Sequence, residues 1–250
     1  MNDSTQPKIQ QQMYTRERHG IFRSTEGFDT IAKSAGLDHS FVKKVLHPFC
    51  QYDAPAELTA RGEKEASLYP EALLLFHAEN GETILGRSTY QPADFTGLRS
   101  AFFTHNYVVP AQYADEPATD YKHWLNAVFE DHYDIEHGTE IPEITAIPVR
   151  ENAATPVHAQ ALLAELHISE QIFKQLLYAA MTSVAGKKKV YIVLDVLVEQ
   201  SAEKAKQLLE VLFASLPYEL RRQLGFLTYA KEPHSKKGVH LMFVEKGSYV

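Results

Sequence analysis

Residues 86–109 read GRSTYQPADFTGLRSAFFTHNYVV, and this stretch sets the character of the N-terminal half of the chain. Both of its ends are strand-like, and residues 99–109 predict a strand whose successive side chains point to opposite faces. Two arginines, Arg87 and Arg99, and the triplet Thr-His-Asn at 104–106 interrupt the apolar residues. Polar groups among aromatic neighbours need hydrogen-bond partners or a ligand. We therefore look for function here first.

Strand alternation divides this triplet between the two faces of the strand. His105 falls on the same face as Phe103 and Tyr107, whereas Thr104 and Asn106 fall on the other. The three polar side chains therefore do not form one cluster. His105 must find its partners on its own face, among groups that come from elsewhere in the chain.

The sequence on the N-terminal side of this stretch predicts more strands. Residues 72–77 and 82–90 predict a hairpin, because Asn-Gly at its tip is the strongest short hairpin signal. Residues 12–15 predict a short strand and residues 20–31 an irregular hairpin. Asp38 is predicted to cap a helix that ends at Pro48.

The C-terminal part of the chain has a different pattern. Ser169 can cap a helix that Gly186 ends, and the apolar run 190–198 predicts a buried strand. An amphipathic helix over 202–216 and strands over 224–229 and 239–244 follow. The order strand, helix, strand predicts a right-handed crossover and a parallel pair.

These elements predict an α+β fold, with a β-rich N-terminal lobe packed against a C-terminal α/β lobe that contains a βαβ crossover and a mixed sheet. We expect a flexible tail over 1–11, the β-rich lobe over 12–150 and the α/β lobe over 151–250. No Gly/Ser-rich linker separates the lobes, so we expect one compact unit.

Composition limits the classes of function. The 250 residues carry a formal net charge of −7, which argues against a general nucleic-acid binder. Cys50 is the single cysteine, so no intrachain disulfide can form. The polar N-terminus lacks a signal core, and no apolar run reaches the about 20 residues of a membrane span. We expect a soluble, cytoplasmic protein with no membrane partner.

Arg87, Arg99 and His105 are the first candidate site residues. The arginines offer donor forks that suit a carboxylate or phosphate, and His105 adds a directional hydrogen bond. The alternative is that the arginines pair with carboxylates such as Asp94 and that His105 is a core histidine. Arg16, in a basic run before Gly20, is a further candidate, with a hairpin of solvated charges as its alternative.

Tyr229 is the last candidate, because it lies at the C-terminal end of a predicted strand, where ligands of α/β units often bind. Its alternative is ordinary packing. No complete catalytic or metal signature accompanies these residues. The acidic run 130–137 lacks the HExxH and CxxC spacings, and the chain has neither a GxxxxGK[ST] loop nor a GxSxG elbow. We predict no catalytic residue, no metal and no cofactor.

Several segments in this order resemble the N-terminal domain, type 2, of bacterial GTPase-associated proteins. The matching pieces are QMYT at 12–15, Gly27-Phe28, RSTY at 87–90, GLRSAFFTH at 97–105, and LPYELR and FLTY within 216–229. Leu98, which separates Gly97 from Arg99, departs from the family pattern, and so does the pair Ser100-Ala101. Both departures weaken the transfer of a site role to Arg99.

The resemblance implies a non-catalytic or uncharacterised module at the front of a longer protein. It also implies that the gene of that protein accompanies a GTPase gene in a signalling or conflict-type system. The leading hypothesis is therefore an adaptor that binds a partner protein, a GTPase among the candidates, or a small anion through Arg87, Arg99 and His105. The alternative is a hydrolase with His105 as base and the two arginines as anion stabilisers. A third hypothesis is a structural lobe for assembly, and the sequence does not predict the oligomeric state.

Overall fold

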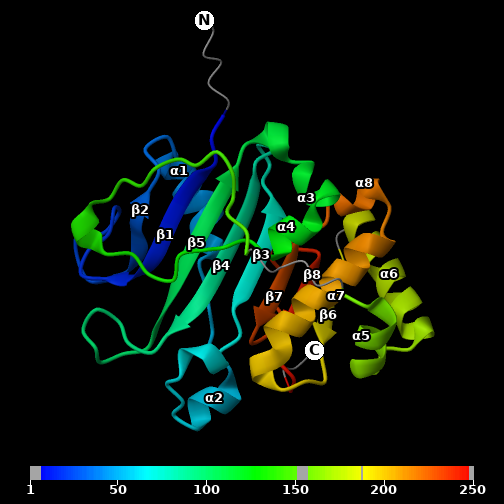
Figure 1. Ribbon diagram of the computed structural model, residues 1–250. Coiled ribbons are helices and arrows are strands. Elements are labelled where there is room, and N and C mark those ends of the chain that lie inside the picture. Colours follow the sequence, from blue (N-terminus) through cyan, green and yellow to red (C-terminus); the bar gives the residue numbers. More distant parts are fainter. Residues whose placement is uncertain (1–6, 151–156, 187, 248–250) are drawn as a thin grey trace, which may run out of the picture.

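One eight-stranded mixed sheet runs through the whole molecule (Figure 1). The structure is a computed structural model that describes residues 7–150, 157–186 and 188–247. The strand order is β2-β1-β5-β4-β3-β7-β8-β6. The strands are β1 (Gln10–Glu17), β2 (Gly27–Lys33), β3 (Ala72–His77), β4 (Thr83–Gln91), β5 (Ala101–Val109), β6 (Val190–Val193), β7 (Phe226–Ala230) and β8 (Leu241–Val244).

The pairing within this sheet confirms the α+β prediction. The five N-terminal strands are antiparallel to their neighbours, and β3 continues the sheet by pairing antiparallel with β7. The last three strands, β7, β8 and β6, are parallel. The strands β6 and β7 that flank the crossover helix are not adjacent, because β8 lies between them.

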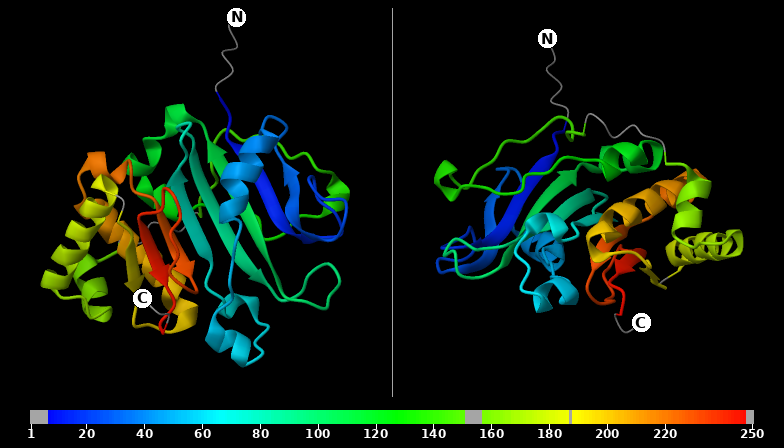
Figure 2. Two further views of the ribbon diagram at one scale, coloured as in Figure 1. Left: turned by 180° about the vertical axis from the view of Figure 1, so that it is seen from behind. Right: turned by 60° about the horizontal axis from the view of Figure 1, so that its bottom comes forward.

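Helices cover both faces of the sheet (Figures 1 and 2). On the face seen in Figure 1, called the front face here, lie α4, α7 and the extended residues 127–147; α1 lies on the back face. The helices are α1 (His39–Phe41), α2 (Ala56–Ala60), α3 (Glu116–Thr119), α4 (Tyr121–Leu125), α5 (Ala159–Glu165), α6 (Glu170–Ala185), α7 (Ser201–Ser215) and α8 (Tyr218–Arg221).

Each face of the sheet has its own apolar core. The front core joins Leu208 and Leu212 of α7 to Leu75 and Leu85 of the sheet. The back core joins the chain around Leu46 to the other side of β3 and β4. Each fully buried leucine contributes about 1.5–3 kcal/mol relative to an exposed one. Because β4 and β5 lie at the centre, polar residues on them are buried on either face.

The hairpin predicted from residues 72–77 and 82–90 is confirmed, with its strands at Ala72–His77 and Thr83–Gln91. Its tip turns at Gly81, whose φ of 88° suits glycine. The amide of Gly81 donates to Ala78 O (3.0 Å), and the side-chain oxygen of Asn80 accepts from the amide of Glu82 (3.1 Å). This turn sets the register that places Arg87 opposite Leu73.

The helix predicted from Asp38 forms only in part. Its cap is confirmed, since the amide of Phe41 donates to Asp38 Oδ1 (2.8 Å). After α1, however, the chain forms a π-helical turn, Val42–Leu46, and then a 3₁₀ turn, His47–Phe49. Pro48 therefore does not end the helical segment as predicted, because a 3₁₀ turn accepts proline in its first positions.

The prediction of a buried strand over 190–198 was wrong. The strand β6 has four residues and is the last in the sheet, and Val193 is 44% exposed. An apolar run does not distinguish a central strand from an edge strand that a helix covers only in part. The first strand is longer than predicted, since Gln10 and Gln11 belong to β1. Residues 1–6 of the expected tail lie outside the described residues.

Candidate functional site

Two of the predicted site residues, Arg87 and His105, lie next to each other on the front face. The register pairs Arg87 of β4 directly with His105 of β5. Both side chains are buried. Of the five candidates, these are the two that the fold brings together.

Arg87 fastens the segment 129–131 to the sheet. Its Nη2 donates to Phe129 O (3.2 Å), to Glu130 O (3.3 Å) and to Asp131 Oδ1, while its Nη1 donates to Glu71 Oε2 (3.4 Å). The Phe129 ring centroid lies 5.3 Å from the guanidinium carbon. Arg87 Nε is buried and has no hydrogen-bond partner among the described residues.

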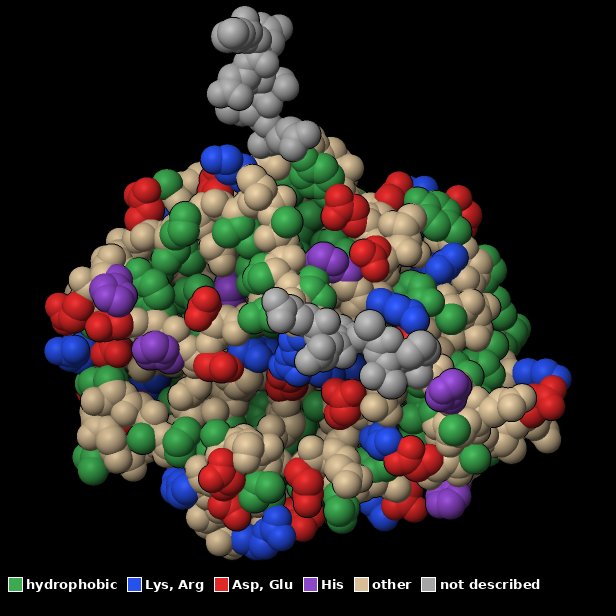
Figure 3. Space-filling model, viewed as in Figure 1, with side chains coloured by type: hydrophobic (Ala, Val, Ile, Leu, Met, Phe, Trp, Pro, Cys, Tyr) green, Lys and Arg blue, Asp and Glu red, His purple; other side chains and the backbone are tan. Residues whose placement is uncertain are grey.

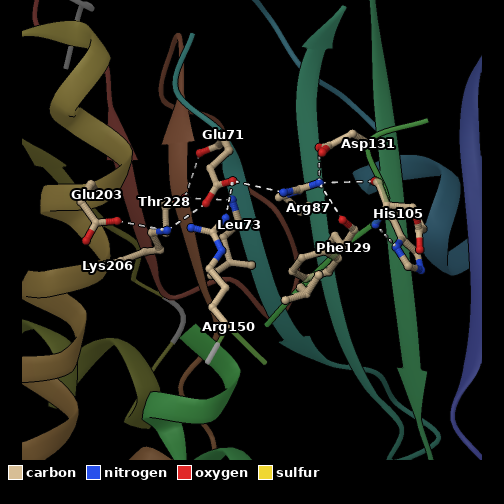
Figure 4. Close-up of polar contacts among 12 residues, drawn as sticks. Glu71, Leu73, Arg87, His105, Phe129, Asp131, Arg150, Glu203, Lys206 and Thr228 are labelled. Atoms are coloured by element: carbon tan, nitrogen blue, oxygen red, sulfur yellow. Dashed lines mark hydrogen bonds and ion pairs between the residues drawn. The ribbon is translucent and has the colours of Figure 1, made fainter. Parts of the chain in front are cut away.

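Glu71 is the carboxylate on which the cations converge (Figure 4). Lys206 Nζ of α7 lies 2.9 Å from Glu71 Oε1, and Arg150 Nη2 lies 4.0 Å from Oε2. Lys206 also pairs with Glu203 one turn earlier (3.2 Å). Burial alone would raise the pKa of Glu71, but Lys206 and then Arg87 and Arg150 outweigh it, so the pKa lies below its usual value. Glu71 therefore remains ionised.

Thr228 of β7 holds the start of β3, where Glu71 lies. Its Oγ1 accepts from the amide of Leu73 (2.8 Å) and donates to Glu71 O (3.3 Å). The side chain thereby replaces backbone pairing at the point where the antiparallel and parallel parts of the sheet meet. The position of Glu71 is thus fixed by both parts of the sheet.

These charged residues lie around an open groove of about 590 Å³, which we call the Arg87 groove. Blue and red side chains gather near the middle of the front face in Figure 3. The carboxylates differ in exposure: the side chains of Asp131 and Glu203 are 74% and 60% exposed, whereas Glu71 is largely buried. The charged lining residues are Glu71, Arg87, Asp131, Arg150, Glu199, Glu203 and Lys206.

His105 is a neutral histidine with both ring nitrogens engaged. The amide of Glu130 donates to Nδ1 (3.0 Å), so the ring proton lies on Nε2, which donates to Gln11 Oε1 (3.0 Å). Burial, with the charge of Arg87 as a second cause, lowers the pKa of His105 to about 3. The ring is not free to act as a base, so the geometry does not support the hydrolase alternative. Its contact with Glu130 instead helps Arg87 to position residues 129–131.

Arg16 and Arg99 lie apart from the Arg87 groove. Arg16 pairs with Asp94 (Nε to Oδ2, 3.0 Å) and with Glu26 (3.1 Å). A hydrogen bond from the Thr96 hydroxyl, and to a lesser extent the one from Arg16, lowers the pKa of Asp94 to about 2. Arg99 is exposed. Its backbone carbonyl accepts a hydrogen bond from the amide of Asp94 (2.6 Å), but its side chain makes no ion pair or hydrogen bond with the described residues. The carboxylate suggested as a partner of Arg87 and Arg99 thus pairs with Arg16.

Tyr229 lies in the apolar core of the back face. Its hydroxyl donates to Asp53 O (3.2 Å) and lies 3.4 Å from Glu245 Oε2. Burial raises the pKa of Tyr229. The fold therefore places Tyr229 on the other face of the sheet from Arg87 and His105. The Tyr229 hydroxyl forms a structural hydrogen bond within the back face.

The back face carries a second polar group, the Asn106 cluster, formed by Gln12, Thr30, Cys50 and Asn106. Asn106 Nδ2 donates to Gln12 Oε1 (2.7 Å) and lies 3.5 Å from Cys50 Sγ, and Gln12 Nε2 donates to Thr30 Oγ1 (2.7 Å). Burial raises the pKa of Cys50 to about 12, so the thiol is not a nucleophile. The adjoining cavity of about 20 Å³ admits nothing larger than a water molecule.

Sequence reasoning missed Glu71, Asp131, Arg150 and Lys206. Glu71 directly precedes an apolar strand, and this was the only local sign of its burial. Asp131 belongs to the acidic run 130–137, which lacks metal-binding spacings and therefore gave no sign of a site. Lys206 alone among the lysines of α7 contacts Glu71, and 135 positions separate the two residues in the sequence.

Two features are absent from the described part of the chain. No group of three or more His, Cys, Asp and Glu side chains in the described part could hold a metal ion. Within the same residues, none of the helices has the length and apolar character needed to cross a membrane.

Comparison with known proteins identifies the family. The model for GTPase-associated protein 1, N-terminal domain type 2, matches residues 8–147, more than half of the chain. The model for the middle domain of GTPase-associated protein 1 matches residues 162–249. Comparison with curated proteins and with solved structures found no significant match. The chain therefore belongs to the GTPase-associated protein 1 family.

Proposed function

We propose that this chain is a non-catalytic adaptor that recognises an anionic group of a partner protein at the Arg87 groove. The observation that carries the proposal is the arrangement of charge there. Three cations converge on one largely buried carboxylate, and two further carboxylates on their outer side are mostly exposed. The family name supports a GTPase as the partner.

The exposed carboxylates can be displaced at low cost. An ion pair with an exposed member contributes about 0–1 kcal/mol, so exchanging Asp131 for an incoming carboxylate or phosphate costs little. Glu71 stays in place, because it is buried and has several cationic partners. Arginine is well suited to the exchange, since its fork binds carboxylates and phosphates with two hydrogen bonds.

The cationic side chains of the Arg87 groove are held in place before a partner binds. Arg87 is held by backbone carbonyls of residues 129 and 130, and Lys206 by its ion pairs with Glu71 and Glu203. Arg150, 55% exposed, adds a third donor at the rim. A preorganised group of donors loses little conformational entropy on binding, which favours recognition.

The test is a calorimetric titration against the GTPase whose gene neighbours that of this protein, in its GDP-bound and GTP-analogue-bound states. We expect binding in at least one state, at least tenfold weaker for Arg150→Ala and stronger for Asp131→Asn. Arg99→Ala serves as the matched control, because that arginine is exposed and lies outside the groove. Absence of binding in both states would remove the GTPase from the proposal.

Binding that Arg150→Ala and Asp131→Asn leave unchanged would place the partner elsewhere and overturn the role of the groove. The two substitutions predict opposite changes in affinity. A general loss of stability would instead weaken binding in both variants, so the comparison separates recognition from unfolding.

A further inference from the structure

A larger groove, of about 770 Å³, lies outside the Arg87 groove. Three segments form it: the helical residues 41–49, the β3–β4 turn at 76–80 and the β7–β8 connection at 234–237. They come from distant parts of the sequence and from both family-matched regions. We call it the Phe49 groove.

Its inner surface is apolar and aromatic. The rings of Phe49 and Phe76 stack with their centroids 4.0 Å apart and their planes within 20°. Phe41, Val45 and Phe49 are only partly buried, although they pack against the back core. Partly exposed apolar side chains that line one concave surface are typical of sites for an apolar side chain of a partner.

The rim of the groove is basic. Lys44, Lys236 and Lys237 line it, whereas Glu79 is the one carboxylate among its described lining residues. This local excess of positive charge stands on a chain whose net charge is −7. Such a reversal of sign attracts an acidic partner and orients it before contact.

The three lysines differ in the hydrogen bonds and ion pairs that they make. Lys236 Nζ lies 5.2 Å from the Phe49 ring centroid and donates to Pro48 O (2.9 Å), so it belongs to the wall of the groove. Lys237 pairs with Glu79, and both side chains are mostly exposed. Lys44 is exposed and makes no ion pair or hydrogen bond with the described residues. Lys44 can thus bind an incoming carboxylate directly, and Lys237 can exchange its exposed partner Glu79 for one at low cost.

We infer that the Phe49 groove docks an acidic segment of a partner protein, with one aromatic or aliphatic side chain seated against Phe49 and Val45 and carboxylates facing Lys44 and Lys237. The argument rests on charge complementarity around an apolar centre. It does not depend on the Arg87 groove, whose cations are held by different residues on the front face. The protein thereby gains a second surface for assembly.

The test selects ligands without assuming their identity. A phage-displayed library of random twelve-residue peptides is panned on the wild-type chain with the double variant Lys44→Glu/Lys237→Glu as counter-selection. Enriched peptides are then synthesised, and their affinities measured by fluorescence anisotropy. The matched control is Lys64→Glu/Lys174→Glu, which changes the net charge equally at exposed lysines outside the groove.

We expect the peptides to combine Asp or Glu with Phe, Leu or Trp. Lys44→Glu/Lys237→Glu should weaken them at least tenfold, the control less than twofold, and a rise from 50 to 500 mM NaCl should also weaken them. Amide chemical-shift changes should centre on residues 41–49 and 234–237. Failure to enrich any peptide, peptides without acidic residues, or equal binding to both double variants would overturn the inference.

Discussion

The two faces of the central strands bury polar groups in different ways. On the front face, Arg87 and His105 lie beside ionised groups and an open groove. On the back face, Asn106 belongs to a cluster of neutral hydrogen bonds next to a cavity of only about 20 Å³. The residues responsible, His105 and Asn106, are neighbours in the sequence.

This difference indicates where on the central strands a ligand can bind. Neutral amides, hydroxyls and a thiol can be sealed without counter-ions, even though Asn106 Oδ1 has no hydrogen-bond partner among the described residues. Charged groups are costly to seal, and those on the front face keep two carboxylates in solvent. A ligand can therefore exchange with existing partners at the Arg87 groove, whereas at the Asn106 cluster it would first have to open the core.

The largest expected effect on stability is that of Glu71→Gln, which tests the charged network of the front face. This change leaves the buried Arg87 and the partly buried Lys206 without their shared anion, which should destabilise the fold by about 3–5 kcal/mol. Urea unfolding at neutral pH measures it. The matched control is Glu203→Gln, whose exposed carboxylate should cost no more than about 1 kcal/mol. Equal losses for the two variants would show that Glu71 is not the centre of the network.

The sealed back face is tested by Gly86→Ala. A methyl group at this position would lie 2.0 Å from Asn106 Oδ1, within a core that two strands fix. Overpacking of this kind should cost about 3 kcal/mol, the upper part of its usual range. In an Asn106→Ala background the clash is absent, so the same substitution should cost less there. A cost that is independent of Asn106 would contradict the close packing of the cluster.

Parts of the fold governed by local chemistry could be predicted from the sequence. The hairpin over 72–91 followed from Asn80-Gly81, and the long helix α6 from its cap at Ser169, because both signals act within a few residues. The strand predicted over 190–198 was wrong, because position in a sheet depends on which strands come to lie on either side.

The candidate site could be predicted only in part, for a similar reason. Arg87 attracted notice as a charge in an apolar strand, and burial of such a charge requires partners. Its partners Glu71 and Asp131 lie 16 and 44 positions away, and nothing local marks them. Arg99 was a candidate because its donor fork suits an anion and it lies in the same stretch as Arg87, but it follows the turn around Asp94 and is exposed.

The smallest effect concerns the proton on His105. Its pKa of about 3 in the folded chain lies below the ordinary value of 6.5, so between these values the unfolded chain binds one more proton. The stability that neutral His105 supplies is therefore complete above pH 6.5 and declines as the pH falls. The loss amounts to about 1.4 kcal/mol for each pH unit, or about 2 kcal/mol between pH 6.5 and 5.

His105→Gln isolates this contribution, because glutamine can donate to Gln11 and accept from the amide of Glu130 but cannot titrate. The free energy of unfolding, measured in urea from pH 7.5 to 5, should fall less steeply for the variant. His240, whose pKa burial lowers to about 4, contributes equally to both proteins and cancels in the difference. Parallel pH profiles would mean that the pKa of His105 is not lowered in the folded chain. They would contradict the assignment of a neutral ring between Arg87 and Glu130.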